Sequence, residues 1–219
     1  RQDLQVVSQR LFSLSAVNLE QILSNLIKSL ESLAEDLEKE VPEVVVDDGG
    51  ILFNYEKSSA MKDIFTHIVR NSIDHGIETP EERKKKGKNS KGKITITGSE
   101  EENFNKIIVK DDGQGLNIQK IKEKAIESGQ LKESGNEDPQ TLANMVFLSG
   151  VSTAKEVTDV SGRGVGMDAV KSFLKGMGGD IEIEFLNDDR NNGDMISFCW
   201  IIKIPRDSTT QGVLSSKPA

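Results

Sequence analysis

The chain has 219 residues, of which 35% are hydrophobic and 29% are charged, which suits one large soluble domain with a hydrophobic core. It contains no run of about 18 apolar residues and no apolar signal-peptide core near its N-terminus, so we expect a cytoplasmic protein without a membrane segment. The net charge of -8 argues against nucleic acid as a partner. The single cysteine, Cys199, excludes an internal disulfide framework and indicates a reducing compartment.

The N-terminal part predicts two helices separated by two short strands. Leucines spaced alternately by four and three residues predict a helix over about 18–39, packed on a sheet rather than in a coiled coil, because the stripe covers too few heptads. The β-rich runs 43–48 and 51–55 flank two glycines, so they predict two strands in a hairpin. A second helix is predicted over about 58–75, ended by a glycine, with a buried side made of Met61, Ile64, Phe65, Ile68 and Ile73.

The polar stretch 79–92 is interpreted as a solvated loop with one turn of helix after Pro80, since a run of charges is usually a soluble surface. Alternating apolar residues then predict paired strands over 93–100 and 105–113. The remaining predicted elements are helices over 117–129, 141–150 and 167–179 and strands over 180–185 and 195–205. This mixture favours the α+β class, as a two-layer α/β sandwich with a mostly antiparallel mixed sheet and helices on one face.

The first candidate site surrounds the two histidines, in the segment 67–76. His67, Asn71 and Asp74 are spaced as on one stripe of a helix, with Arg70 beside it and His75 after it. The Asn71 carbonyl oxygen suits a Mg²⁺ that also keeps phosphate oxygens and waters, whereas two histidines without a partner cysteine make a poor zinc site. The alternative is a polar helix end without chemistry.

The second candidate site is the segment 111–115, at the end of a strand. Asp111 places a carboxylate at the mouth of the sheet, where it can accept a hydrogen bond from an exocyclic amine. Gly113 and Gly115 allow a ligand to approach the backbone closely. The alternative is an ordinary Asp-Gly turn, which is common.

Two further segments contain residues suited to anions. The segment 162–167 has three alternating glycines before a helix, which leaves backbone N–H groups free to face an anion, although it is neither a Walker A loop nor a dinucleotide fingerprint. In the segment 147–154, Gly150 permits a hinge, and Ser152 and Thr153 can donate to phosphate oxygens. The alternative for 147–154 is a mobile connection without a ligand.

The order of these four motifs resembles the ATP-binding fold shared by histidine kinases, DNA gyrase, heat-shock chaperones and mismatch-repair proteins, the Bergerat-type fold. The segments "HIVRNSIDHGIETPEERKKKGK", "DDGQG" and "FLSGVSTAKEVTDVSGRGVGMDAVK" are similar, nearly residue for residue, to the ATP-binding domain of the CheA family of bacterial chemotaxis histidine kinases. The resemblance runs over about 12–205 and implies a two-component protein-histidine kinase that uses ATP and Mg²⁺.

The resemblance also implies roles for individual residues. Asn71 would coordinate the Mg²⁺ that bridges the phosphates, Asp111 would accept the adenine amino group, and Gly115 would back the base. His67 matches the place where hydrolytic members carry a glutamate that activates water, which implies transfer of the phosphoryl group to a histidine instead. His67 is therefore the expected catalytic residue, which orients or deprotonates the incoming imidazole.

The remaining expected ATP-binding positions belong to the same motifs. Arg70, His75 and Lys120 match polar positions near the phosphates, and Asp74 and Gly113 complete the first two motifs. A flexible ATP lid is implied by Ser152, Thr153, Ser161, Gly162, Arg163, Gly164, Val165, Gly166 and Met167.

Both histidines belong to the nucleotide motif, so the phospho-acceptor histidine is expected on a separate phosphotransfer domain, in cis or in trans, with a response regulator downstream. A chemoreceptor and a coupling protein are further partners that the resemblance implies through domains absent from this chain. Residues 1–13 are expected to be the tail of a dimerisation helix or linker, 14–206 the catalytic domain, and 207–219 a disordered tail. Because the dimerisation domain is absent, we expect a monomer.

Two alternatives stay open. An ATP-hydrolysing conformational ATPase of the same superfamily is disfavoured by histidine at position 67. A nucleotide-binding regulatory module without catalysis is disfavoured by the complete set of motif positions.

Overall fold

The computed structural model describes residues 15–133, 137–151, 166–186 and 195–206. The expectations for residues 1–13 and for the tail from 207 onward lie outside this part of the chain, as do the lid positions from Ser152 to Val165. Among the described helices, none combines the length and the apolar character needed to cross a bilayer.

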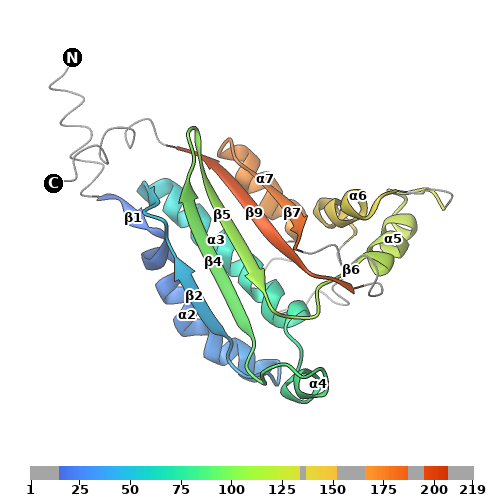
Figure 1. Ribbon diagram of the computed structural model, residues 1–219. Helices are drawn as coiled ribbons and strands as arrows, with labels where there is room; N and C mark the ends of the chain where they lie inside the picture. The colour runs from blue at the N-terminus through green and yellow to red at the C-terminus, as the bar shows by residue number, and fades with distance from the viewer. Residues whose placement is uncertain (1–14, 134–136, 152–165, 187–194, 207–219) are drawn as a thin grey trace, which may run out of the picture.

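One layer of the fold is a five-stranded mixed sheet (Figure 1). In spatial order it contains β2 (Glu43–Asp47), β4 (Lys93–Glu100), β5 (Phe104–Asp111), β9 (Phe198–Pro205) and β7 (Asp180–Phe185). β2 runs parallel to β4, and the other neighbours are antiparallel. The predicted sheet class is therefore confirmed.

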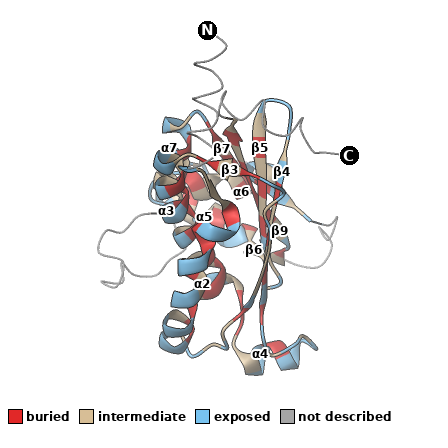
Figure 2. Cartoon of the chain, turned by 90° about the vertical axis from the view of Figure 1, so that its left-hand side faces the viewer, coloured by how far each residue is buried: buried red, intermediate tan, exposed pale blue. Residues whose placement is uncertain are grey.

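The second layer consists of helices on one face of this sheet (Figure 2). It contains α2 (Leu19–Asp36), α3 (Tyr55–Asn71) and α7 (Met167–Gly176). The apolar side predicted for the second helix is fully buried, and so are the alternate residues Ile94, Ile96, Ile107 and Val109 of the central strands. The apolar residues of the helices and those of the strands pack together in one core, which confirms the predicted two-layer sandwich.

Smaller elements complete the edges of the sandwich. They are β1 (Val17–Asn18), β3 (Leu52–Phe53), α4 (Pro80–Lys85), β6 (Leu116–Asn117), α5 (Ile118–Glu127), α6 (Pro139–Asn144), the 3₁₀ turn η2 (Met145–Phe147) and β8 (Met195–Ile196). β6 follows the turn after β5, and β8 lies just before β9. Their pairing brings these two distant segments side by side.

The predicted hairpin between 43–48 and 51–55 is wrong. β2 pairs with β4, whereas β3 pairs with β1 in a separate two-stranded ribbon. Two glycines in left-handed conformation turn the chain between β2 and β3, as expected, but Gly49 packs against the Gly98 backbone of β4. A local turn signal does not specify which strand becomes the partner, because pairing is decided by distant residues.

The second helix changes its winding at its end. α3 stops at Asn71, and the chain continues in a π-turn, η1 (Ser72–Gly76). Lys39 lies beyond α2 and donates to the carbonyl oxygens of Ile73 and Asp74 at 2.6 and 2.7 Å. The π-helical winding of η1 shifts the helical register. Asp74 therefore does not continue the regular stripe of His67 and Asn71.

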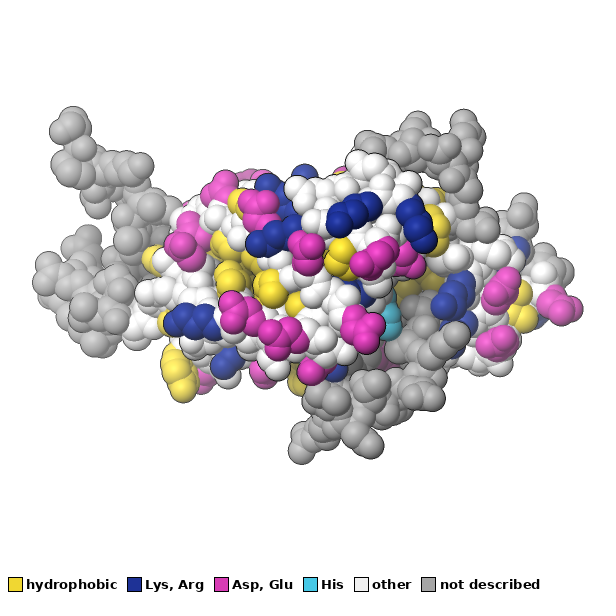
Figure 3. All heavy atoms as spheres, turned by 90° about the horizontal axis from the view of Figure 1, so that it is seen from below, with side chains coloured by type: hydrophobic (Ala, Val, Ile, Leu, Met, Phe, Trp, Pro, Cys, Tyr) yellow, Lys and Arg dark blue, Asp and Glu magenta, His cyan; other side chains and the backbone are white. Residues whose placement is uncertain are grey.

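The basic stretch around α4 is mostly exposed and contains the helix turn predicted after Pro80, but one of its basic side chains is buried. Arg83 is completely buried and contacts Glu78 at 3.2 Å and Asp112 at 2.7 Å, while Lys86 and Lys88 each bond Glu78 at 3.0 Å. On the face seen in Figure 3, positive and negative side chains are interleaved rather than gathered into one basic patch. The cluster is thus a charge network around the buried pair of Arg83 and Glu78.

The pH dependence of stability follows from this network. Burial alone would raise the pKa of Glu78, but hydrogen bonds from Lys88 and Lys86 lower that pKa to about 2 from the ordinary 4.5. A pKa lowered in the folded state stabilises the fold above pH 4.5, and this stabilisation is lost as the pH falls from 4.5 towards 2.

Glu78→Gln should lower the unfolding free energy at pH 7 by about 3 kcal/mol and flatten its pH dependence between pH 4.5 and 2. Denaturant unfolding at several pH values measures both effects, with the exposed Glu81→Gln as control. An unchanged acid dependence in Glu78→Gln would contradict this assignment.

Candidate functional site

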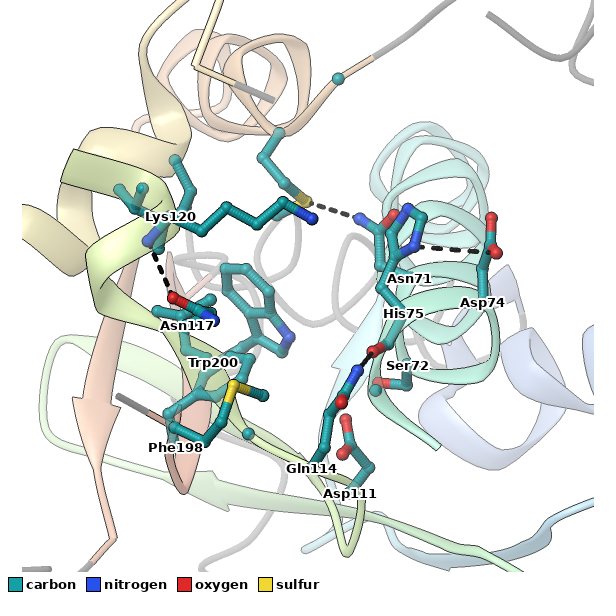
Figure 4. Close-up of a pocket in the computed structure, with 18 residues that line it drawn as sticks. Asn71, Ser72, Asp74, His75, Asp111, Gln114, Asn117, Lys120, Phe198 and Trp200 are labelled. Carbon is teal, nitrogen blue, oxygen red and sulfur yellow. Dashed lines mark hydrogen bonds and ion pairs between the residues drawn. The ribbon is translucent and has the colours of Figure 1, made fainter. Parts of the chain in front are cut away.

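A cavity of about 360 Å³ lies where the end of α3, the turn after β5, α5 and the start of α7 meet (Figure 4). Its volume is in the usual range for a small-molecule site. The sequence-predicted residues that line it are Asn71, Asp74, His75, Asp111, Gly115, Lys120, Gly166 and Met167. The tertiary structure thus brings three of the four sequence motifs to one place, within the part of the chain that it describes.

Asp111 is the acidic group at the base of the cavity. Its Oδ1 accepts a hydrogen bond of 3.0 Å from the Gly113 backbone N–H. Burial raises the pKa of the Asp111 carboxyl, and Asp112 adds to this, whereas the Ser72 hydroxyl, the Gly113 N–H and Lys88 oppose it. The Ser72 hydroxyl is buried and makes no hydrogen bond of good geometry, although it is near enough to affect this pKa. A desolvated carboxylate beside an unsatisfied hydroxyl is suited to a polar ligand group.

The glycines around Asp111 allow close backbone contacts. A Cβ on Gly113 would lie 2.2 Å from the Gly76 carbonyl oxygen, and one on Gly115 would lie 2.6 Å from the Ile196 carbonyl oxygen. The Gln114 N–H also donates to the Gly76 oxygen at 2.8 Å. The close approach that the sequence assigned to a ligand is therefore made by other parts of the chain, and Gly115 also borders the cavity.

One wall of the cavity is apolar and was not predicted from the sequence. It contains Leu116, Ile121, Val146, Met195, Phe198 and Trp200. The rings of Phe198 and Trp200 meet edge to face, with centroids 5.1 Å apart. Such a wall suits a flat, weakly polar ring system. For Met195, Phe198 and Trp200, the sequence pattern of 195–205 predicts strand positions but does not indicate that their side chains face a ligand.

The opposite end of the cavity favours negative charge. α7 begins beside Asn71, whose Nδ2 donates to Met167 Sδ at 3.1 Å. Gly166, at the N-cap, supplies no side-chain hydrogen bond, so the first N–H groups of the helix can donate to an anion. Figure 4 shows the Lys120 side chain extending across the cavity towards Asn71.

Three predicted residues lie outside the lining. Gly113 supports Asp111 from behind, while His67 and Arg70 lie on α3 before Asn71. Burial lowers the pKa of His67, Asp63 opposes this shift, and Arg70 adds to it. His67 is therefore mainly neutral at pH 7 and can accept a proton.

A metal held by the protein alone does not suit this region. Among the described residues, no group of three or more His, Cys, Asp or Glu side chains is placed to hold a metal ion. A Mg²⁺ that takes most ligands from phosphate oxygens and waters needs only one or two protein oxygens. Because Nδ2 of Asn71 is directed to Met167, its Oδ1 remains as such an oxygen.

Other lining residues missed by the sequence analysis are polar. Ser72, Gln114 and Asn117 all line the cavity, and the Gln114 side chain donates to the His75 carbonyl oxygen at 2.8 Å. Asn117 also caps α5 by accepting from the Lys120 N–H. Ser72 directly follows Asn71, Gln114 lies within the 111–115 motif, and Asn117 lies two residues after it. This closeness to the motifs was the signal by which the sequence could have indicated them.

The family of histidine kinase-, DNA gyrase B- and HSP90-like ATPases matches residues 56–207 of the chain. This match covers more than half of the sequence, so the chain belongs to that family. It is an ATPase-type domain, and membership of this family implies a nucleotide as its class of ligand.

Within the family the chain is similar to CheA proteins. It is 39% identical to the chemotaxis protein CheA of Bacillus subtilis over 75% of this chain and 23% of that protein. It is 38% identical to CheA of Salmonella typhimurium over 81% of this chain and 26% of that protein. It is 42% identical to the sensor histidine kinase CheAY of Helicobacter pylori over 72% of this chain and 18% of that protein. The chain thus spans about a quarter or less of these relatives.

Solved structures support the fold. The nucleotide-free catalytic domain of histidine kinase ThkA superposes with a TM-score of 0.52 at 15% identity, over 87% of this chain and 95% of that chain. A mycobacterial sensor histidine kinase, MprB, gives a TM-score of 0.50 at 14% identity, over 87% and 95%. At this identity the likeness concerns the fold alone.

The contact between Gly113 and Gly76 gives a stability prediction. Gly113→Ala should lower the unfolding free energy by about 1–3 kcal/mol, because the new methyl group would overlap the Gly76 carbonyl. Gly176→Ala is the matched control, since a Cβ added at this position of α7 would meet nothing within 4 Å and alanine favours helix. Thermal unfolding distinguishes the two variants, and equal melting temperatures would contradict the close contact.

Proposed function

We propose that the cavity binds Mg-ATP and that the domain transfers the γ-phosphoryl group to a histidine on a separate phosphotransfer domain. The observation that carries this proposal is the division of the cavity lining. A partly buried carboxylate and an apolar wall lie at one end, and hydrogen-bond donors, a lysine and a helix N-terminus lie at the other. A nucleotide has the same division, with a flat base at one end and a polyanion at the other.

At the base end, Asp111 would accept a hydrogen bond from the adenine amino group. Guanine carries a carbonyl oxygen at that position, which would face the carboxylate as a second acceptor. Adenine should therefore be preferred, because a buried acceptor left without a donor is costly. Phe198 and Trp200 would complete the wall against which the base packs.

At the phosphate end, Lys120, His75, Arg70 and the first N–H groups of α7 would bind phosphate oxygens. The same role is proposed for the lid residues Ser152, Thr153 and 161–165, which lie outside the described chain. Asn71 would hold Mg²⁺, which when bound neutralises phosphate charge.

The transfer step would use a nitrogen of the acceptor imidazole as the nucleophile. A phosphorus–nitrogen bond forms, the bond from phosphorus to the β,γ-bridging oxygen breaks, and ADP leaves. The proton on the other imidazole nitrogen would pass to His67, whose lowered pKa keeps it neutral. A histidine at this position lacks the carboxylate that activates water in hydrolytic relatives.

The partners follow from the similarity to CheA and are part of the proposal. They are a phosphotransfer domain in cis or in trans, a response regulator that receives the phosphoryl group, and a chemoreceptor with its coupling protein. All of these would act in the cytoplasm.

Nucleotide binding can be measured through Trp200, the only tryptophan of the chain, because it borders the cavity. Mg-ADP and Mg-ATP should change its emission, whereas Mg-GTP should do so only at much higher concentration. Asp111→Ala should weaken adenine nucleotide binding by about 10- to 100-fold, through loss of a hydrogen bond to a charged group. Asn71→Ala should weaken Mg²⁺-dependent binding specifically. Equal affinities for ATP and GTP would contradict the role of Asp111.

Phosphoryl transfer can be measured with radiolabelled ATP and candidate histidine phosphotransfer domains. His67→Gln should keep wild-type nucleotide affinity and reduce label transfer by about 10²- to 10⁴-fold, the usual contribution of a general base. Full transfer by this variant would remove the proposed role of His67. Binding without transfer to any acceptor would indicate a regulatory module, and steady ATP hydrolysis without an acceptor would indicate a conformational ATPase.

A further inference from the structure

Lys88 lies just after α4, is not among the residues that line the cavity, and reaches the turn that carries Asp111. Its ammonium group donates to the carbonyl oxygens of Asp112 at 2.9 Å and Gly113 at 2.7 Å, and to Glu78 Oε1 at 3.0 Å. The N–H of Gly113 in turn donates to the Asp111 carboxylate at 3.0 Å. One peptide group thus links the ammonium of Lys88 to the carboxylate in the cavity.

We propose that Lys88 is a positioning residue for nucleotide binding, which holds the 111–113 turn so that the Asp111 carboxyl group faces the base. This inference rests on the proposed function of the cavity. It adds a residue that neither lines the cavity nor belongs to the predicted site.

The first argument is geometric. The turn is fixed laterally through the Asp112 side chain, which contacts Arg83 at 2.7 Å and the Lys93 N–H at 2.9 Å. The backbone carbonyls of Asp112 and Gly113 both accept from the Lys88 ammonium, at 2.9 and 2.7 Å, and Arg83 makes only a longer bond of 3.4 Å to the Asp112 carbonyl. A partly buried carbonyl that loses its shortest hydrogen bond tends to rotate towards water. The Asp112 carbonyl and the Gly113 N–H belong to one peptide group. Rotation of this peptide group would displace the N–H that orients the Asp111 carboxylate.

The second argument is electrostatic. The groups that face Asp111 are the Ser72 hydroxyl from η1, the Gly113 N–H and Asp112 from its own turn, and Lys88 from the segment after α4. Burial and Asp112 raise the pKa of Asp111; the Ser72 hydroxyl and the Gly113 N–H oppose this most, and Lys88 adds a smaller opposing effect as a nearby positive charge. Without Lys88 the carboxyl would take up a proton at higher pH and lose its charge as an acceptor.

The chain contains a matched control in Lys86. Its ammonium bonds the same oxygen of Glu78 at the same distance of 3.0 Å. In the described part of the chain, that ammonium has no contact with the 111–113 turn. Lys86→Met and Lys88→Met each remove one bond to Glu78, and only Lys88→Met removes the bonds to the turn.

The test is isothermal titration of both variants and of the wild-type chain with Mg-ADP between pH 5 and 8, alongside their thermal unfolding. Lys88→Met should bind ADP about tenfold more weakly at pH 7, and its acid-side loss of affinity should occur at higher pH than in the wild type. Lys86→Met should match the wild type in both respects. Lys88→Arg, which keeps the charge, should restore the wild-type pH profile.

Equal ADP affinities and pH profiles for the two methionine variants would overturn the inference, and so would a uniform loss of affinity in Lys88→Met with an unmoved pH profile. If Lys88→Met does not fold, Lys88→Gln takes its place, since it keeps a donor without the charge. A wild-type pH profile in Lys88→Gln would also overturn the inference. Absence of ADP binding by the wild-type chain would instead contradict the proposed function.

Discussion

The contact between Gly76 and Gly113 is the constraint on which the site depends. One glycine ends the π-turn after α3 and the other lies in the turn after β5, and no side chain fits between them. The hydrogen bond from the Gln114 N–H to the Gly76 carbonyl oxygen fixes their relative position. This contact places Asp111 against Ser72 at the end of the segment that carries Asn71. The two sequence motifs become one cavity because their backbones touch.

Charged side chains hold this contact from outside the cavity. Lys39 binds the carbonyls of the π-turn, whereas Arg83 and Lys88 bind the turn after β5. Turns of this kind expose backbone carbonyls that strands and helices would have paired, so long cationic side chains are suitable partners. A buried arginine also needs its own acceptors, and Glu78, Asp112 and the Asn89 carbonyl supply them. The network thus satisfies both the turn and its own charges.

The lining of the cavity is divided between an apolar part and a polar part. Its aromatic residues and the Asp111 carboxyl lie on the β5 and β9 side, and its donors lie on α5 and at the ends of α3 and α7. His67 lies one helical turn before Asn71 and outside the lining. We infer that this chain binds and orients the donor, while the nucleophile comes from another domain.

The sequence by itself determined the features that depend on neighbouring residues. The apolar stripe of α2, the buried side of α3 and the hairpin of β4 and β5 follow local periodicity, and Asn71 and Asp111 were identified from short motifs. Tertiary structure alone decided that β2 pairs with β4, that Arg83 is buried, and that Phe198 and Trp200 form a wall of the cavity. The reason is that helical and strand periods repeat within a few residues and can be read along the chain. Strand partners, the burial of a charge and the lining of a cavity depend on contacts between residues far apart in the sequence, which no local pattern records.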